Sequence, residues 1–238
     1  MRIAAILLIA FAGVMEAQIT MCSAEPETVG PYTLVQRCDY NSQINLPKAA
    51  VTFKTANKAG NWINVSIYAG QSYLHTFQIT DTVGNTYIKA ASIGNSTSDS
   101  TVAMFFADYI HEGTNTITVV PDHPGYMRIV IREYAGVSER ESLDTATGKF
   151  GMSDQPESGT MRTNSHGDLI VSAAIMSDAS SVSAGAGAVN VDFIPEPPGT
   201  KLVVEDEYQA HSGLSSACVT LGSPRNWAMI SVAFKSGK

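Results

Sequence analysis

Apolar and polar side chains alternate along most of this chain with a period of two, the spacing that indicates β-strands. The clearest strand is WINVSIY at residues 62–68, where every second residue is a branched apolar one. The segment 126–134 alternates in the same way and places Arg128 and Arg132 on the face opposite its methionine and isoleucines.

Further strands are expected wherever short apolar or alternating runs lie between turn residues. These are 32–38, 49–54, 101–110, 116–120, 168–176, 189–194, 201–205, 207–211, 217–221 and 227–234. No helix-period pattern of convincing length follows the N-terminal region. About a dozen short strands with Gly, Pro, Asn and Asp turns predict an all-β fold: a two-sheet antiparallel β-sandwich, jelly-roll-like.

The stretch 72–92 is predicted to form a hairpin that turns at Asp81–Asn85. The Asp81 carboxylate can accept hydrogen bonds from backbone N–H groups that follow it, and Gly84 can adopt a positive φ without a Cβ clash. Asp81, Gly84 and Asn85 are therefore expected to form a type I turn closed by a G1 bulge, a fold-setting turn that fixes strand register.

The segment Val137–Gly167 breaks the strand pattern, because it is rich in Ser, Thr, Gly, Asp and Glu. A structureless loop of about thirty residues is unusual in a compact domain. The alternatives are a boundary between two subdomains, a surface flap or a binding loop. Because neither half shows obvious closure on its own, we expect residues 32–238 to form a single β-sandwich domain with a long polar loop at 137–167.

The N-terminus has the pattern of a secretory signal peptide. Arg2 supplies a positive charge, and residues 3–14 form an uncharged apolar run that is too short to span a bilayer comfortably. We expect cleavage after Ala17, with Ala24 as the alternative end, so that 1–17 is the signal peptide and 18–31 an extended leader. An uncleaved anchor or a buried strand is the alternative interpretation. The expected localisation is secreted, extracellular or at the cell surface, with the periplasm as the alternative.

Three cysteines remain to be placed. Cys38 and Cys218 lie in predicted strands at opposite ends of the chain, first and late strands of sandwiches often lie close together, and an exported protein meets oxidising conditions. We expect a Cys38–Cys218 disulfide, with two buried free thiols as the alternative. No CxxC spacing is present, so a zinc site of cysteines is not expected.

Composition and net charge exclude some classes of binding partner. The chain is 44% hydrophobic and 16% charged, which allows a sizeable core and argues against bulk disorder. Its formal net charge is −7 and no Lys/Arg cluster occurs. Nucleic acid is therefore not an expected partner, and neither is an anionic membrane surface. No membrane insertion is expected after signal cleavage, because no later run has the length and apolarity of a membrane helix.

An ordered set of turn and core motifs lies between about residues 49 and 235. They are Gly60-Asn61-Trp62, Asp81-x-x-Gly84-Asn85-x-Tyr87, Glu133-Tyr134-x-Gly136, Gly167-Asp168-Leu169, Tyr208-Gln209, Trp227-Ala228 and Ala233-Phe234-Lys235. This order resembles a diffuse group of secreted bacterial β-sandwich modules found in extracellular and surface proteins. The resemblance implies the sandwich fold and no catalytic residues. The chain departs from the group because its sandwich follows a signal peptide alone and because the cysteine pair is not part of the pattern.

Familiar catalytic signatures are missing: the sequence contains no GxSxG elbow, no HExxH, no P-loop and no GxGxxG. Asp108, His111, Glu112, Asp122 and His123 lie close together in sequence around one strand connection. The functional interpretation is a metal or acid–base site, and the simpler one is a group of solvated loop residues. We therefore expect no metal, with Asp122 and His123 as the first candidates if one is bound.

No cofactor is expected. Structural calcium is the alternative, because Asp81 with Asn85 and the acidic run 205–207 offer oxygen ligands, although no EF-hand loop occurs. Glu133 is expected to accept hydrogen bonds at a strand end beside Tyr134 rather than to act as a catalytic carboxylate.

Aromatic residues offer the most direct handle on binding. Trp62, Tyr68, Tyr73 and Tyr87 can supply a platform on which sugar rings stack, if the sheet face or loop rim that carries them is exposed. The alternative is that they belong to the sandwich core.

Together these observations predict a secreted, non-catalytic β-sandwich protein that binds extracellular glycan or a surface protein, or builds extracellular structure. A carboxylate- or His-dependent secreted hydrolase is one alternative. A virion or appendage subunit is another, because residues 18–31 form a segment that can be donated to a neighbouring subunit. The sequence does not indicate an oligomeric state.

Overall fold

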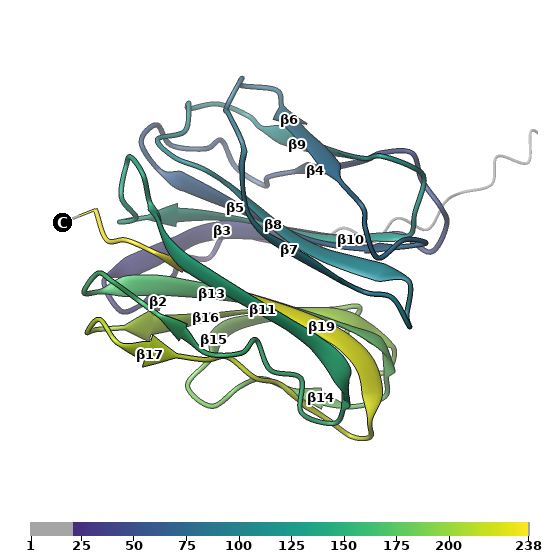
Figure 1. The fold of residues 1–238 in the computed structure, drawn as a ribbon. Helices are drawn as coiled ribbons and strands as arrows, with labels where there is room; N and C mark the ends of the chain where they lie inside the picture. The colour runs from purple at the N-terminus through teal and green to yellow at the C-terminus, as the bar shows by residue number, and fades with distance from the viewer. Residues whose placement is uncertain (1–20, 238) are drawn as a thin grey trace, which may run out of the picture.

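The computed structural model describes residues 21–237, which lie in strands, turns and loops with no helix among them. Figure 1 shows the strands in layers: a small sheet, a seven-stranded sheet beneath it, and a five-stranded sheet below that. Every strand pair is antiparallel. The predicted all-β antiparallel sandwich is thereby confirmed. The signal peptide predicted at 1–17 lies outside the described residues.

The seven-stranded sheet comes from the first half of the chain. Its strands are β1 (Cys22–Ser23), β2 (Glu27–Val29), β3 (Tyr32–Asn41), β5 (Trp62–Gly70), β7 (Ile88–Asn95), β8 (Ser100–Ala107) and β10 (Met127–Ala135). Their order is β1-β3-β10-β5-β8-β7, with β2 paired to β3.

The five-stranded sheet comes from the second half. It contains β11 (Leu143–Ser153), β13 (Asp168–Ala179), β15 (Val189–Ile194), β16 (Thr200–Gln209) and β19 (Arg225–Phe234), in the order β11-β19-β13-β16-β15. The two large sheets are therefore not interleaved, yet one hydrophobic core lies between them and draws on both halves of the chain.

Smaller sheets cover the outer faces. β4 (Ala49–Thr52), β9 (Thr116–Pro121) and β6 (Phe77–Asp81) form a three-stranded sheet over the seven-stranded one. Two short pairs, β12 (Met161–Arg162) with β17 (Leu214–Ser215) and β14 (Val182–Ser183) with β18 (Thr220–Leu221), lie on the side of the five-stranded sheet.

The alternation of β5 has a simple physical meaning, because this central strand is buried on both faces. Ile63, Val65 and Ile67 pack beneath the three-stranded sheet. Trp62 and Tyr68 face the five-stranded sheet. A strand covered on both sides needs apolar residues on both, which also explains the nearly continuous apolar run of β8.

The hairpin predicted at 72–92 is wrong. β6 pairs with β9 and β7 pairs with β8, so the two strands belong to different sheets. The turn between them carries the chain from the small sheet to the large one. Its centre is Asp81, whose carboxylate accepts hydrogen bonds from the backbone N–H groups of Gly84 and Asn85 and from the side chains of Asn85, Tyr87 and Asn115. Burial alone would raise the pKa of Asp81, but these hydrogen bonds lower it below its ordinary value.

Replacing Gly84 by valine should lower the free energy of unfolding by roughly 1 kcal/mol or more. Gly84 has a φ of +82°, and an added Cβ would meet nothing within 4 Å, so the cost is backbone strain alone. Urea unfolding measures it. Gly84→Asn should cost less, because asparagine tolerates the left-handed region better. Equal stability of the valine variant and the wild type would contradict this account of the turn.

The predicted Cys38–Cys218 disulfide is also wrong. Cys22 on β1 lies opposite Cys38 on β3, with their Cα atoms 4.1 Å apart, and these two form the disulfide. Cys218 is an exposed free thiol, because it lies near β18, on the side of the five-stranded sheet. A disulfide is compatible with an extracellular protein. No helix among residues 21–237 is long and apolar enough to cross a membrane.

Two segments expected to lack regular pairing contain strands. The leader 18–31 includes β1 and β2, which pair with β3 within the chain instead of remaining free. The loop 137–167 includes β11, an edge strand that pairs along its length with β19, and the short β12. β11 escapes a hydrophobic pattern search because, as an edge strand, it leaves many of its side chains partly or fully exposed.

Candidate functional site

Strand β10 carries two arginines, Arg128 and Arg132, on the face toward the five-stranded sheet. Their side chains have different partners. The Arg132 side chain is fully buried. Its guanidinium donates hydrogen bonds to the carboxylates of Asp206 and Asp192 and to the carbonyl oxygens of Asn190 and Val204. Burial alone would lower the pKa of Arg132, but Asp206 and Asp192 hold it well above its ordinary value. Arg132 is thus an internal clamp between the two large sheets.

Arg128, four residues earlier on the same strand, has no such carboxylate. It is 6% exposed, yet none of the hydrogen bonds and ion pairs of residues 21–237 involves its side chain, and its Nε is buried without an acceptor. Its contact is with an aromatic ring: the guanidinium carbon lies 5.2 Å from the centroid of Tyr68. Burial lowers the pKa of Arg128, but an arginine stays protonated in proteins. The negative charge of Asp178 acts on Arg128, but the ion-pair partner of Asp178 is Lys201. A buried cation without a directly bonded counter-ion is costly, so a ligand anion could bind Arg128 here.

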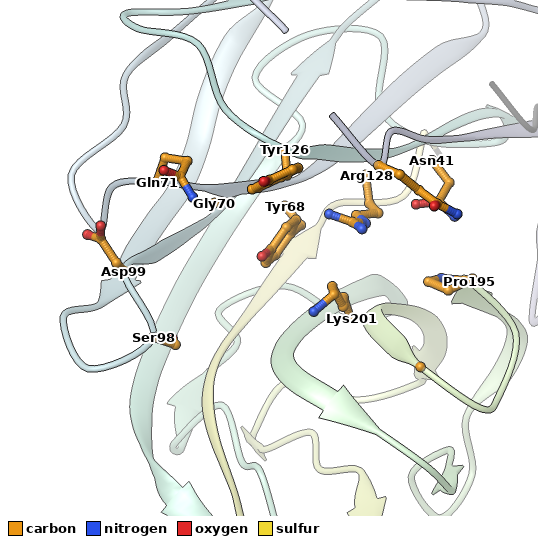
Figure 2. A pocket seen from close by; sticks show the side chains of 12 residues that line it. Asn41, Tyr68, Gly70, Gln71, Ser98, Asp99, Tyr126, Arg128, Pro195 and Lys201 are labelled. Carbon is orange, nitrogen blue, oxygen red and sulfur yellow. The ribbon is translucent and has the colours of Figure 1, made fainter. Parts of the chain in front are cut away.

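The guanidinium of Arg128 lies at a cleft of about 500 Å³ between the ends of the two large sheets. Figure 2 shows Tyr68, Tyr126 and Arg128 side by side, with Lys201 and Pro195 across the cleft. The remaining lining residues are Asn41, Gln43, Gly70, Gln71, Ser98, Asp99 and Gly199. Lys201 pairs with Asp178, which lies outside this lining.

The rim of the cleft is strained. Gln71 has a φ of +80° and Asp99 a φ of +47°, a backbone region that costs non-glycine residues about 1–3 kcal/mol. Such strain concentrates at ligand-binding segments. With a guanidinium, two tyrosines and several amides, the cleft can offer charge-assisted hydrogen bonds, a ring surface and neutral hydrogen bonds at once.

The four aromatic residues singled out from the sequence do not form one platform. Tyr68 lines the cleft. Trp62 is 1% exposed and packs in the core against Phe234. Tyr87 packs against the core between the seven-stranded and three-stranded sheets, and its hydroxyl donates a hydrogen bond to Asp81. Tyr73 is 42% exposed but does not line the cleft.

The acidic and histidine residues considered as one cluster at 108–123 do not all lie together in the structure. Asp108 accepts hydrogen bonds from Ser142, and the backbone and ring of His111 bond Asn85 and Val83. Asp122 and His123 lie instead against the buried His75, a residue that no sequence spacing connects to them.

The structure also places the carboxylates considered for catalysis or calcium binding. Glu133 accepts hydrogen bonds from Gln36, Asn57, Asn61 and the backbone N–H of Lys58, so its role is structural. Glu205 and Glu207 line a cavity of about 160 Å³, smaller than the roughly 300–1,000 Å³ of ordinary ligand sites. Burial raises the pKa of Glu205 to about 7.

The sequence analysis did not identify four residues that line the cleft: Arg128, Lys201, Tyr126 and Asn41. One signal was present: Arg128 and Arg132 lie on one face of a strand whose other face is apolar. The ion-pair partners of Arg132 are Asp192 and Asp206, which lie at least sixty residues later in the sequence, so the sequence does not show which arginine is paired. Comparison of the chain with family models, curated proteins and solved structures found no match. The structure shows an all-β sandwich with a cleft lined by Arg128, Lys201 and two tyrosines.

Proposed function

We propose that this is a secreted, non-catalytic β-sandwich protein that binds an acidic extracellular glycan in the cleft at Arg128. The N-terminal signal pattern and the Cys22–Cys38 disulfide support export. The observation that carries the proposal is Arg128, which is 6% exposed and lines the cleft while its guanidinium makes no hydrogen bond or ion pair with a carboxylate of the described residues.

Chemistry favours a sugar acid as the ligand. A guanidinium matches the geometry of a carboxylate or sulfate with paired N–H donors. The amides of Asn41, Gln43 and Gln71 suit sugar hydroxyls, and the rings of Tyr68 and Tyr126 suit the apolar face of a sugar. The cleft volume lies in the range of known ligand sites.

The lining also favours binding over hydrolysis. One carboxylate, Asp99, is among the residues that line the cleft, whereas most glycosidases use two carboxylates that flank the scissile bond. The resemblance to secreted bacterial sandwich modules likewise implies no catalytic residues.

A glycan array with acidic chains and their carboxyl-reduced counterparts tests this proposal. The wild-type protein should bind acidic chains, and Arg128→Met should lose this signal. Arg140→Met is the matched control, because Arg140 is exposed and lies outside the cleft. Equal binding of acidic and reduced chains, or retention of the signal by Arg128→Met, would contradict the proposal.

A further inference from the structure

A second cluster with unassigned chemistry lies at the end of the three-stranded sheet. His75 precedes β6, and Asp122 and His123 follow β9. These two strands pair through Phe77 and Pro121, and the N–H of Asp122 donates to the carbonyl oxygen of Thr76. The pairing of the strands therefore brings His75 beside two residues more than forty positions later in the sequence.

The three side chains converge on one point. The Nδ1 atoms of His75 and His123 lie 2.8 and 3.0 Å from the same oxygen, Oδ1 of Asp122. The two imidazole rings stack with centroids 4.1 Å apart, and both place Nδ1 near the same carboxylate oxygen. All three ligand atoms lie within 4.8 Å of one another.

His75 is oriented as a metal ligand would be. Its side chain is fully buried, and its Nε2 lies 3.0 Å from the carbonyl oxygen of Gly70. Donation from Nε2 to this carbonyl fixes the tautomer and leaves a lone pair on Nδ1 directed at Asp122. Metal-binding histidines typically show this second hydrogen bond to a backbone carbonyl or carboxylate.

The charges also call for a cation. In the neutral form of that tautomer the Nδ1 lone pair of His75 faces a carboxylate oxygen 2.8 Å away. The two lone pairs repel each other unless both atoms bind a cation that lies beside them. A divalent ion at this point would accept the lone pairs of both Nδ1 atoms and of the carboxylate together.

We propose that His75, Asp122 and His123 bind a divalent transition-metal ion of the zinc type. Two imidazole nitrogens and one carboxylate oxygen suit this class better than calcium or magnesium, which prefer all-oxygen sites. The side chains of Asp122 and His123 are 38% and 46% exposed, so a fourth position is open to solvent. The ion ties the ends of β6 and β9 to Gly70, which also lines the glycan cleft.

Calorimetric titration of zinc chloride into the metal-depleted chain tests the proposal. The wild type should bind a single equivalent, and cobalt should give the visible absorption bands of a site containing nitrogen ligands. His123→Ala and Asp122→Asn should each bind about tenfold or more weakly, and both residues are exposed enough to change without unfolding the protein. Their melting temperatures without metal verify that they fold.

His166→Ala is the matched control, because the rings of His166 and His211 form the other neighbouring histidine pair that the structure describes. Its affinity for zinc should equal that of the wild type. Absence of saturable zinc binding in the wild type would overturn the proposal. Unchanged affinity in His123→Ala, or a loss that follows His166→Ala instead, would also overturn it.

Discussion

Replacement of Arg132 by methionine should lower the free energy of unfolding by about 3–5 kcal/mol, the cost of leaving a buried charge without its partner. The side chains of Arg132 and Asp206 are both fully buried, and Nη1 of Arg132 lies 2.6 Å from Oδ1 of Asp206. Methionine fills a similar volume but cannot donate, so the Asp206 carboxylate keeps hydrogen bonds from Tyr134 and Asn190 alone. Because natural domains have about 5–15 kcal/mol of stability, urea unfolding should show a large fall in the midpoint.

The double variant Arg132→Met with Asp206→Asn separates charge from packing. Asparagine removes the uncompensated charge while it still accepts from Tyr134, so the double variant should be more stable than Arg132→Met alone. A loss below about 1 kcal/mol in the single variant, as for an exposed pair, would contradict the clamp. The clamp would also be contradicted if the double variant lost at least as much unfolding free energy as Arg132→Met and Asp206→Asn lose together.

Stability should fall as the pH rises from about 5 to 8. Burial and the neighbouring Asp144 raise the pKa of Asp168 to about 7, and burial raises the pKa of Glu205 to about 7 and of Asp39 to about 6. In the unfolded chain such groups titrate near 4. Between these values the folded state holds protons that the unfolded state has lost, so each rise in pH favours unfolding. For Asp168, whose exposure is 0%, the effect is on the order of 3 kcal/mol.

Asp168→Asn isolates this effect. The variant keeps the shape of the side chain but cannot ionise, so its melting temperature should fall less than that of the wild type between pH 5 and 8. Thermal unfolding at several pH values measures the difference. Below about pH 4 the opposite trend should appear, because the lowered pKa of Asp81 means that its hydrogen-bonded carboxylate loses its contribution on protonation. Parallel curves for the variant and the wild type would show that Asp168 is ionised in the folded protein.

Local patterns predicted the strands well, because burial leaves a direct trace in the sequence. Ile63, Val65 and Ile67 lie on the face of β5 that packs beneath the three-stranded sheet, and Trp62 and Tyr68 lie on the face toward the five-stranded sheet. β11 left no such trace, since Phe150 and Met152 are 53% and 72% exposed at the sheet edge. Strand pairing has no local signal in the sequence either. The turn at Asp81 is visible, but no nearby residue indicates that β6 pairs with β9.

The candidate site was harder to predict than the fold, because its residues become distinctive only through distant ones. Arg128 and Arg132 look alike in sequence, and Asp192 and Asp206 decide which of them is paired. Cys22 lies between the two predicted cleavage sites, after Ala17 and after Ala24, and no local pattern indicates that it pairs with Cys38. Asp122 and His123 were recognised as polar neighbours, but His75 joins them only through the pairing of β6 with β9.

The central claim is that Arg128 receives an acidic sugar, and calorimetric titration with an oligogalacturonate tests it most directly. The wild type should bind the acidic oligosaccharide, and raised salt should weaken the binding. Arg128→Met should reduce the affinity by about tenfold or more, because a charge-assisted hydrogen bond contributes about 1.5–3 kcal/mol. Arg140→Met should leave the affinity unchanged. Failure of the wild type to bind any acidic oligosaccharide, or equal affinity in Arg128→Met, would contradict the account.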